Sequence, residues 1–295
     1  MAIRAPYRSL RGISAVAALL TIGAVGCSDV SDAVDSAKDS AKKVTRQRSV
    51  FSLDTGDCYN PNGKAEETAY AVEIVPCDEA HKGQVVGEFA IDNGKGYPGD
   101  DGISAIADTR CPGEAQNYAP DTWALPKGVA LFYYTPTKES WATGDRAVSC
   151  TYTVEKGTFS GSLATAKSLK PEQTTYLKGS NAVYEALWAH QSEKDAVEDD
   201  LAGYKAQAKA VAAALDAHVK GLDGIEGTEV GKLRATLTKA AGNWKKAASA
   251  ADADTFYIAY DPAFTDINPS KSVAARKELG LATTVPADEA EVWAG

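Results

Sequence analysis

The chain has 295 residues, which is enough for one large domain or two of moderate size. Its hydrophobic fraction of 44% and charged fraction of 24% are typical of a soluble globular protein with a sizeable core. The formal net charge of −9 indicates no basic surface of the kind that follows a phosphate backbone. We therefore expect no nucleic acid among its partners.

Residues 1–26 have the features of a bacterial export signal. Three arginines come first, and the apolar stretch Ile13–Gly26 then covers 14 residues, fewer than the roughly 20 that a spanning helix needs. The stretch ends in "AVGC", which resembles the lipobox of bacterial lipoproteins, with Ala24 where leucine is commoner. This resemblance implies cleavage after Gly26 and a lipid on Cys27. The alternative is ordinary secretion, with Cys27 left as a spare thiol.

Removal of the signal also changes the charge of the chain. Residues 1–26 carry three arginines and no acid, so the formal net charge falls from −9 to −12. An anionic membrane surface repels such a chain, and attachment is therefore expected to depend on the lipid. We expect the protein on the extracytoplasmic face of the cell membrane, anchored through Cys27.

The remaining cysteines are even in number. An even count in an exported chain predicts two disulfides. The four cysteines are Cys58, Cys77, Cys111 and Cys150. The count alone leaves three pairings open.

The first part of the predicted mature chain comprises a tether and an α+β module. Residues 27–50 are small and polar with a thin helical stripe, which is typical of a tether. Residues 51–157 contain the four paired cysteines, and we expect a small antiparallel sheet there. Gly102–Ala119 has room for one or two short helices. Four stretches rich in β-branched and aromatic residues predict strands, at Ala69–Val75, Gln84–Ile91, Val129–Tyr134 and Ala147–Val154.

The second part is predicted to be helical. Residues 158–170 are expected to form a linker, 171–282 a helical bundle, and 283–295 a loosely held tail. Proline at position 171 suits the first turn of a helix. Phe256–Phe264 is expected to begin a further helix. The predicted fold class is therefore α+β, with a disulfide-stapled antiparallel sheet domain followed by an all-α hairpin or bundle.

Two apolar seams define the expected helical hairpin. Their members alternate at spacings of three and four, which predicts two antiparallel helices packed along their length. Trp188 and Trp244 are expected to add bulk to this core. The first seam contains Leu201, Tyr204, Ala208, Val211, Leu215, His218 and Leu222; the second contains Val230, Leu233, Leu237, Ala240, Trp244, Ala247 and Ala251.

The segment from Cys77 to His81 places Cys, Asp, Glu and His within five positions. Zinc needs about four ligands at set spacings, but the segment has no CxxC or HxxxH partner. A catalytic thiolate would require Cys77 to remain reduced outside the membrane. We therefore interpret the segment as a structural turn. Asp78 is expected to cap backbone N–H groups, and His81 is expected to bond back to the turn.

Other catalytic signatures are not found in the sequence. It contains no GxSxG elbow and no P-loop, and its "DEAH" motif has no P-loop to accompany it. Adjacent acids such as Glu66 and Glu67 would point to opposite faces of a strand, so they do not suggest a glycosidase pair. We expect no enzymatic activity, no cofactor and no metal.

A set of short motifs resembles the actinobacterial septum formation domain family. They are "GDC" (56–58), "VPCDEAH" (75–81), "YPG" (97–99), Cys111, Trp141 and "GDRAVSC" (144–150). Ala80 and Lys82 depart from the family pattern. The resemblance covers about residues 51–155 and implies a disulfide-containing module of the cell envelope without established catalytic residues. It also implies the pairs Cys58–Cys77 and Cys111–Cys150.

Three functions are compatible with these patterns. The first is a non-enzymatic envelope lipoprotein that acts as a binding or scaffold module in envelope or septum assembly. Its partner would be another envelope protein or a cell-wall component. The second is a sensory or solute-binding lipoprotein that holds a ligand between its two parts. The third is an enzyme acting on the wall, which requires a buried acid or histidine in a cleft. We favour the first.

Overall fold

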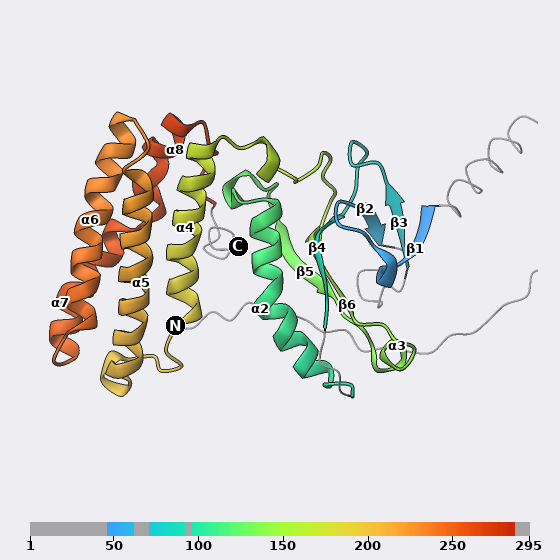
Figure 1. Ribbon diagram of the computed structural model, residues 1–295, viewed down its shortest axis with the longest axis horizontal. Coiled ribbons are helices and arrows are strands. Elements are labelled where there is room, and N and C mark those ends of the chain that lie inside the picture. Colours follow the sequence, from blue (N-terminus) through green and yellow to red (C-terminus); the bar gives the residue numbers. More distant parts are fainter. Residues whose placement is uncertain (1–45, 62–70, 92–95, 287–295) are drawn as a thin grey trace, which may run out of the picture. The chain divides into compact units, whose positions relative to one another are not determined.

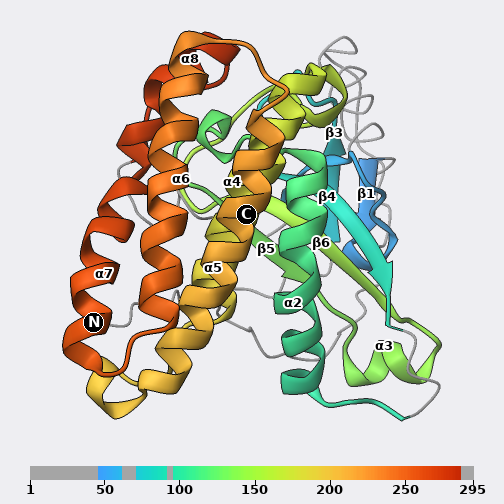
Figure 2. The same cartoon turned by 60° about the vertical axis from the view of Figure 1, so that its left-hand side comes forward.

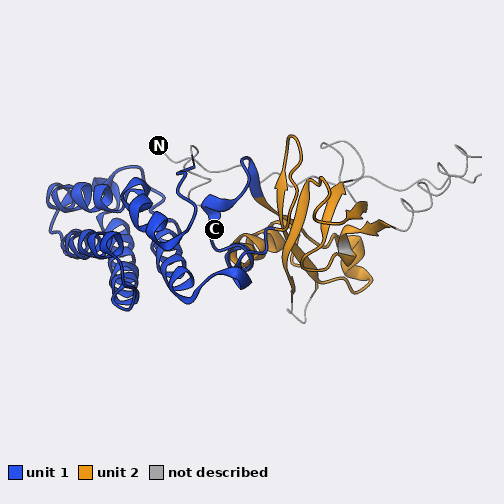
Figure 3. Ribbon diagram, turned by 90° about the horizontal axis from the view of Figure 1, so that it is seen from above, with its two compact units in different colours: residues 1–5, 112–130, 163–295 blue, residues 6–111, 131–162 orange. Residues whose placement is uncertain are grey.

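The computed structural model describes residues 46–61, 71–91 and 96–286. The predicted signal, Cys27, most of the 27–50 tether and the end of the 283–295 tail lie outside this range. Among the described residues, a sheet unit contains positions up to 111 together with 131–162, and a helical unit contains 112–130 together with positions from 163 onward (Figure 3). Residues 112–130, which the sequence analysis assigns to the α+β module, thus cluster with the helical unit.

An antiparallel sheet of six strands, in the order β1-β3-β2-β4-β6-β5, forms the centre of the described sheet domain (Figure 1). The fold class is α+β, as predicted. β3, β4, β5 and β6 occupy the expected stretches, because alternating β-branched and aromatic residues suit a pleated, half-buried surface. The strands are β1 (Gln47–Ser49), β2 (Cys58–Pro61), β3 (Ala71–Val75), β4 (Gly83–Ala90), β5 (Val129–Tyr134) and β6 (Ala147–Val154).

The two shortest strands were not predicted. β1 lies within the expected tether, and β2 lies outside the four stretches that predict strands. Both pair with β3, and β2 also pairs with β4, so that Cys58 stands opposite Val75 on one side and Gln84 on the other. Strands of three or four residues carry too little alternation to be recognised without their partners.

The interior of the sheet unit packs around Tyr59, which is fully buried. A methyl group on Gly83 would lie 2.6 Å from the Tyr59 hydroxyl oxygen and 2.8 Å from its Cε1, so a larger residue cannot occupy this position without displacing the ring. The other buried members of this cluster are Val50, Leu53, Val72 and Val85.

Helices and short 3-10 turns lie between the strands of the sheet along the chain. The predicted helical stretch is a single helix, α2 (Asp100–Tyr118), of 19 residues with Pro112 inside it. Two acids in its first turn interact favourably with the positive end of the helix dipole. α3 (Lys138–Ala142) begins with a capping box between Thr137 and Ser140. The 3-10 turns η1 (Val50–Ser52) and η2 (Thr122–Ala124) lie before β2 and β5.

The helical unit contains the predicted hairpin and the predicted further helix (Figure 2). α4 begins with Pro171 in its first turn. All six predicted seam residues of α6 up to Ala247 and most of those of α5 are buried, including His218, whereas the seventh predicted position, Ala251, lies beyond the end of α6 and is exposed. The helices are α4 (Pro171–Ala189), α5 (Leu201–Leu222), α6 (Thr228–Ala248), α7 (Ala253–Asp266) and α8 (Val273–Leu279), with η3 (Ala166–Ser168), η4 (Val197–Asp199) and η5 (Pro269–Ser272) between them.

The two tryptophans expected in the bundle core differ in their exposure to solvent. Trp244 is fully buried and stacks edge-on against Tyr260, with ring centroids 5.2 Å apart. Trp188 is 45% exposed, so the expectation that it adds bulk to the core is wrong. It directly follows the buried Leu187 in the last turn of α4, and the next position of a helix faces another direction.

The start of α6 is capped by a side chain from another helix. The Glu278 carboxylate accepts hydrogen bonds from the backbone N–H groups of Thr228, Glu229 and Val230 at 3.0, 2.8 and 2.9 Å. These donors have no partner within their own helix. The anionic cap thereby fastens α8 to α6. Within the described ranges, no helix is both long and apolar enough to cross a membrane.

Candidate functional site

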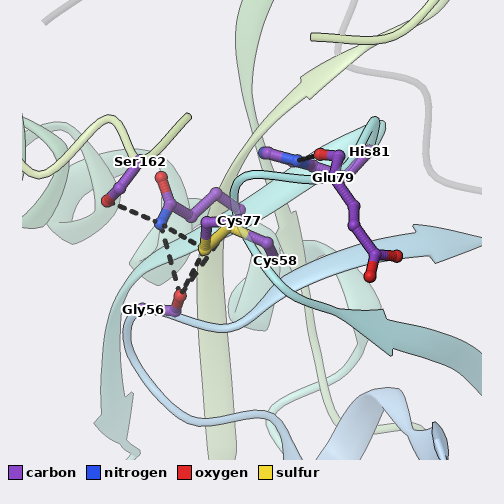
Figure 4. The surroundings of a disulfide bond; sticks show 7 residues. Gly56, Cys58, Cys77, Glu79, His81 and Ser162 are labelled. Carbon is purple, nitrogen blue, oxygen red and sulfur yellow. Dashed lines mark hydrogen bonds between the residues drawn. A yellow bond between two sulfur atoms is a disulfide. The ribbon is translucent and has the colours of Figure 1, made fainter. Parts of the chain in front are cut away.

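The Cys77–His81 segment forms a turn between β3 and β4 (Figure 4). Cys77 is bonded to Cys58, with their Cα atoms 5.2 Å apart. The backbone N–H of Glu79 donates to the Pro76 carbonyl at 3.0 Å, which closes the turn. His81 Nδ1 lies 2.8 Å from the Glu79 carbonyl, so this nitrogen is the N–H donor of the ring. The expected bond from His81 back to the turn is present.

His81 also pairs with a distant part of the chain. It is fully buried, and its backbone exchanges two hydrogen bonds with Phe159, of 2.8 and 2.9 Å. Its ring contacts the Phe159 ring edge-on, with centroids 4.3 Å apart. The backbone N–H of Gly161 donates to the Cys77 carbonyl. The first residues of the expected 158–170 linker are therefore paired to this turn.

Gln84 completes the surroundings of the disulfide. Its side chain is fully buried, and its Nε2 donates to the Gly56 carbonyl at 3.3 Å and to Ser162 Oγ at 3.1 Å. Gly56 has a φ of 103°, which favours glycine at this position of the "GDC" motif. Sequence analysis missed the role of Gln84. The sequence does place a glutamine at the start of an apolar strand, and this pattern could have indicated a buried, hydrogen-bonded side chain.

Two of the reactive side chains of this segment, those of Cys77 and His81, have structural partners. Cys77 is oxidised, so it is not a thiolate ligand or nucleophile. Asp78 is exposed, and its carboxylate makes no hydrogen bond to the described residues, so its predicted capping role has no counterpart there. Within the described ranges, no group of three or more His, Cys, Asp or Glu side chains is placed to hold a metal ion.

A second cluster brings together the other signature motifs. The Arg146 guanidinium lies 3.7 Å above the centre of the Trp141 ring, and the Tyr97 ring contacts Trp141 edge-on at 5.6 Å. Arg146 Nη1 also donates to the carbonyls of Trp141 and Asp145, at 2.8 and 2.6 Å. The ring contact between Tyr97 and Trp141 thus joins motifs separated by more than 40 positions, and the cation–π contact and hydrogen bonds of Arg146 hold Trp141 to the neighbouring "GDR" motif.

Turn geometry supports this second cluster. Gly144 has a φ of 102°, and the Asp145 carboxylate accepts from the backbone N–H of Ala147 at 3.0 Å. The Tyr97 hydroxyl donates to the Asp100 carboxylate at the start of α2. Burial, followed by this hydrogen bond, raises the pKa of Tyr97 above its ordinary value. The "YPG" and "GDR" motifs thus shape turns at the ends of α2 and β6.

The second disulfide joins Cys111 of α2 to Cys150 of β6, with Cα atoms 5.4 Å apart. Both residues are fully buried. The two disulfides have the pairing that the family resemblance implies. Each ties a signature motif to a strand of the sheet, so the cysteines contribute to the folding of this unit.

Comparison with protein families agrees with the resemblance that the short sequence motifs suggest. A protein-family model described as "Septum formation" matches residues 25–150. This match confirms the resemblance and links the N-terminal part of the chain to that family. The comparison with curated proteins found no match. The comparison with solved structures found none either.

Proposed function

We propose that this protein is a non-enzymatic, lipid-anchored module on the extracytoplasmic face of the membrane, acting in envelope or septum assembly by binding another envelope component. One observation carries the proposal: two disulfides lie within the region that matches the septum formation family. Disulfides of this kind persist in oxidising compartments. They support an exported location, as does the signal-like start of the sequence.

The roles of the signature residues favour binding over catalysis. His81 holds a turn, Arg146 stacks on Trp141, and the four cysteines form disulfides. Their side chains are engaged in covalent bonds, hydrogen bonds and ring contacts that stabilise the module. A rigid module of this kind is suited to presenting a surface of fixed shape to a partner.

Metabolic labelling with an alkyne-bearing fatty acid tests the anchor. The unaltered chain should take up the label, and the Cys27→Ala variant should lose it and leave the membrane fraction. Ser28→Ala is the matched control, because it changes the next residue and keeps the thiol. Label retained by Cys27→Ala would contradict the anchor.

Proximity labelling in growing cells tests the partner class. A labelling enzyme fused to the C-terminus of the chain should enrich exported proteins of the cell wall and the division site. Enrichment of cytosolic proteins would contradict the proposed location. Enrichment of envelope proteins in general, without division-site proteins, would contradict the septal role. It would remain consistent with the lipid anchor.

A further inference from the structure

The solvent-facing sides of α6 and α7 carry rows of opposite charge. On α6, Lys239 and Lys246 are exposed and lie seven positions apart. On α7, Asp254 and Asp261 are exposed and have the same spacing. Seven residues of an α-helix span about 10.5 Å, so the two rows share one repeat. The ion pair between Lys239 and Asp266, at 3.0 Å, shows that the lysine row borders α7.

The two charged rows also lie at matching levels. α6 and α7 pack against each other and are joined by the short turn 249–252, so they run antiparallel (Figure 2). Counted from this turn, Lys246 lies level with Asp254. Seven residues further from the turn, Lys239 lies level with Asp261. Each cation of one helix therefore has an anion of the neighbouring helix beside it.

An apolar side chain and a recess lie between the charges. Ile258, which lies between Asp254 and Asp261 on α7, is 76% exposed. On α6, the positions between the two lysines are Gly242 and Asn243. A methyl group on Gly242 would meet nothing within 4 Å apart from its own helix backbone, so the surface is open there. Residues at i, i+3, i+4 and i+7 of a helix form a hole that accepts a side chain from a facing helix.

We propose that this face of α6 and α7 docks onto the same face of a second copy of the chain. A two-fold axis parallel to the helices places each α6 against the α7 of the other copy, as in an isologous interface. The lysines of one copy then meet the aspartates of the other at the same levels. Ile258 enters the hole beside Gly242. Charge and shape are thus both self-complementary.

Other occupants fit this face less well. An anionic membrane surface would attract the lysines and repel the aspartates, and a basic partner would do the reverse. A matching partner must carry both rows at this spacing, as the chain itself does. α7 has 14 residues, which limits the shared surface to about 21 Å in length, so we expect a weak and reversible dimer. This inference does not depend on the proposed function.

Photo-cross-linking in cells tests the dimer with the full chain. Cells produce two copies with different C-terminal tags, both with benzoylphenylalanine at Thr265, an exposed position on the same side of α7 as Ile258. We expect a product that carries both tags. The same cross-linker at Ala213, an exposed position of α5, is the control and should give none. Equal yields from both positions, or a product from Thr265 that contains only lipid or another protein, would overturn the proposal.

Substitutions in the recess separate docking from folding. Gly242→Gln fills the hole with a better helix former than glycine, so the fold should persist while the doubly tagged product falls by about tenfold or more. Gly231→Gln is the matched control. Gly231 also has open space on α6, but it lies further from the turn than the end of α7, so the yield should stay unchanged. Equal yields from the two variants would contradict docking through this hole.

Charge reversal tests the pairing between copies. Lys246→Glu in both copies, or Asp254→Lys in both copies, brings like charges together across the dimer, so either change should lower the yield by about tenfold. When one copy carries the first change and the other copy the second, both contacts again join a cation to an anion. The doubly tagged product should then return, which also shows that both variants fold. A yield that stays low in this mixture would overturn the proposed arrangement.

Discussion

Asp121 and Arg276 form a buried ion pair across 155 positions of sequence. Their side chains are 6% and 3% exposed. The Arg276 guanidinium lies 4.0 Å above the Trp123 ring, and its Nε donates to the Ala282 carbonyl at 2.6 Å. The segment that follows α2 is thereby held by α8. Part of the region that matches the septum formation family belongs structurally to the helical unit.

Removing one partner of this pair should be strongly destabilising. Asp121→Ala leaves the Arg276 charge buried and unpaired, which typically costs about 3–5 kcal/mol. Denaturant unfolding of the full chain measures the change. The matched control is Asp223→Ala, which breaks the exposed pair between Arg234 and Asp223, 40% and 65% exposed, and should cost no more than about 1 kcal/mol. Equal losses of unfolding free energy in the two variants would show that the buried ion pair stabilises the fold no more than an exposed one.

The close approach of α4 and α5 predicts opposite effects of two glycine substitutions. Gly179→Ala places a methyl group on the His218 ring, so it should destabilise the helical unit by about 1–3 kcal/mol. Gly231→Ala lies on α6 with open space around it, and it should stabilise the protein by up to about 1 kcal/mol. Thermal unfolding of both variants compares them. A stabilising Gly179→Ala would contradict the packing of His218 against α4.

Acid should weaken the fold through His218. Its pKa is lowered from 6.5 to about 4 in the folded state, so the unfolded chain binds the proton more readily. Stability from this group is complete above pH 6.5 and is lost as the pH falls toward 4, by about 3 kcal/mol in total. Unfolding free energies at pH 7 and pH 4.5 measure the loss.

The His218→Phe variant should lack this part of the pH dependence, and His190→Phe should keep it, because His190 is exposed. If both variants lose stability between pH 7 and 4.5 as steeply as the unaltered chain, His218 is not responsible for the acid sensitivity.

The two disulfides should contribute unequally to the free energy of unfolding. Cys58–Cys77 spans 19 positions and Cys111–Cys150 spans 39, so loop-closure entropy predicts about 3 and about 4 kcal/mol respectively. Each pair is replaced by two alanines, and unfolding is followed under non-reducing conditions. A larger loss for the shorter loop would mean that packing around Gln84 and Gly56, rather than chain entropy, dominates.

Several features were predictable because they depend on neighbours in sequence. The seams of α5 and α6 repeat every three or four residues, and β5 and β6 are dense in β-branched and aromatic side chains. The even number of cysteines predicted two disulfides, and the combination of signature motifs indicated the resemblance to the septum formation family. Each of these signals is complete within a short window or a count.

Other features were decided by contacts between distant positions. β1 and β2 become strands only because β3 and β4 supply their hydrogen bonds. Gln84 reaches Ser162 across 78 positions, and nothing beside it in sequence indicates that partner. Trp188 is exposed whereas its neighbour Leu187 is buried, and the apolar character of both residues does not reveal which of them faces the core.

The sequence by itself therefore determined the strand-rich and helix-rich parts of the chain, the number of disulfides and the resemblance of the N-terminal part to the septum formation family. The tertiary structure alone decided that Asp121 meets Arg276, that His81 meets Phe159 and that His218 lies against Gly179. The physical reason is that periodicity reports which face of an element is apolar, whereas hydrogen bonds and ion pairs depend on the path of the chain between the two partners.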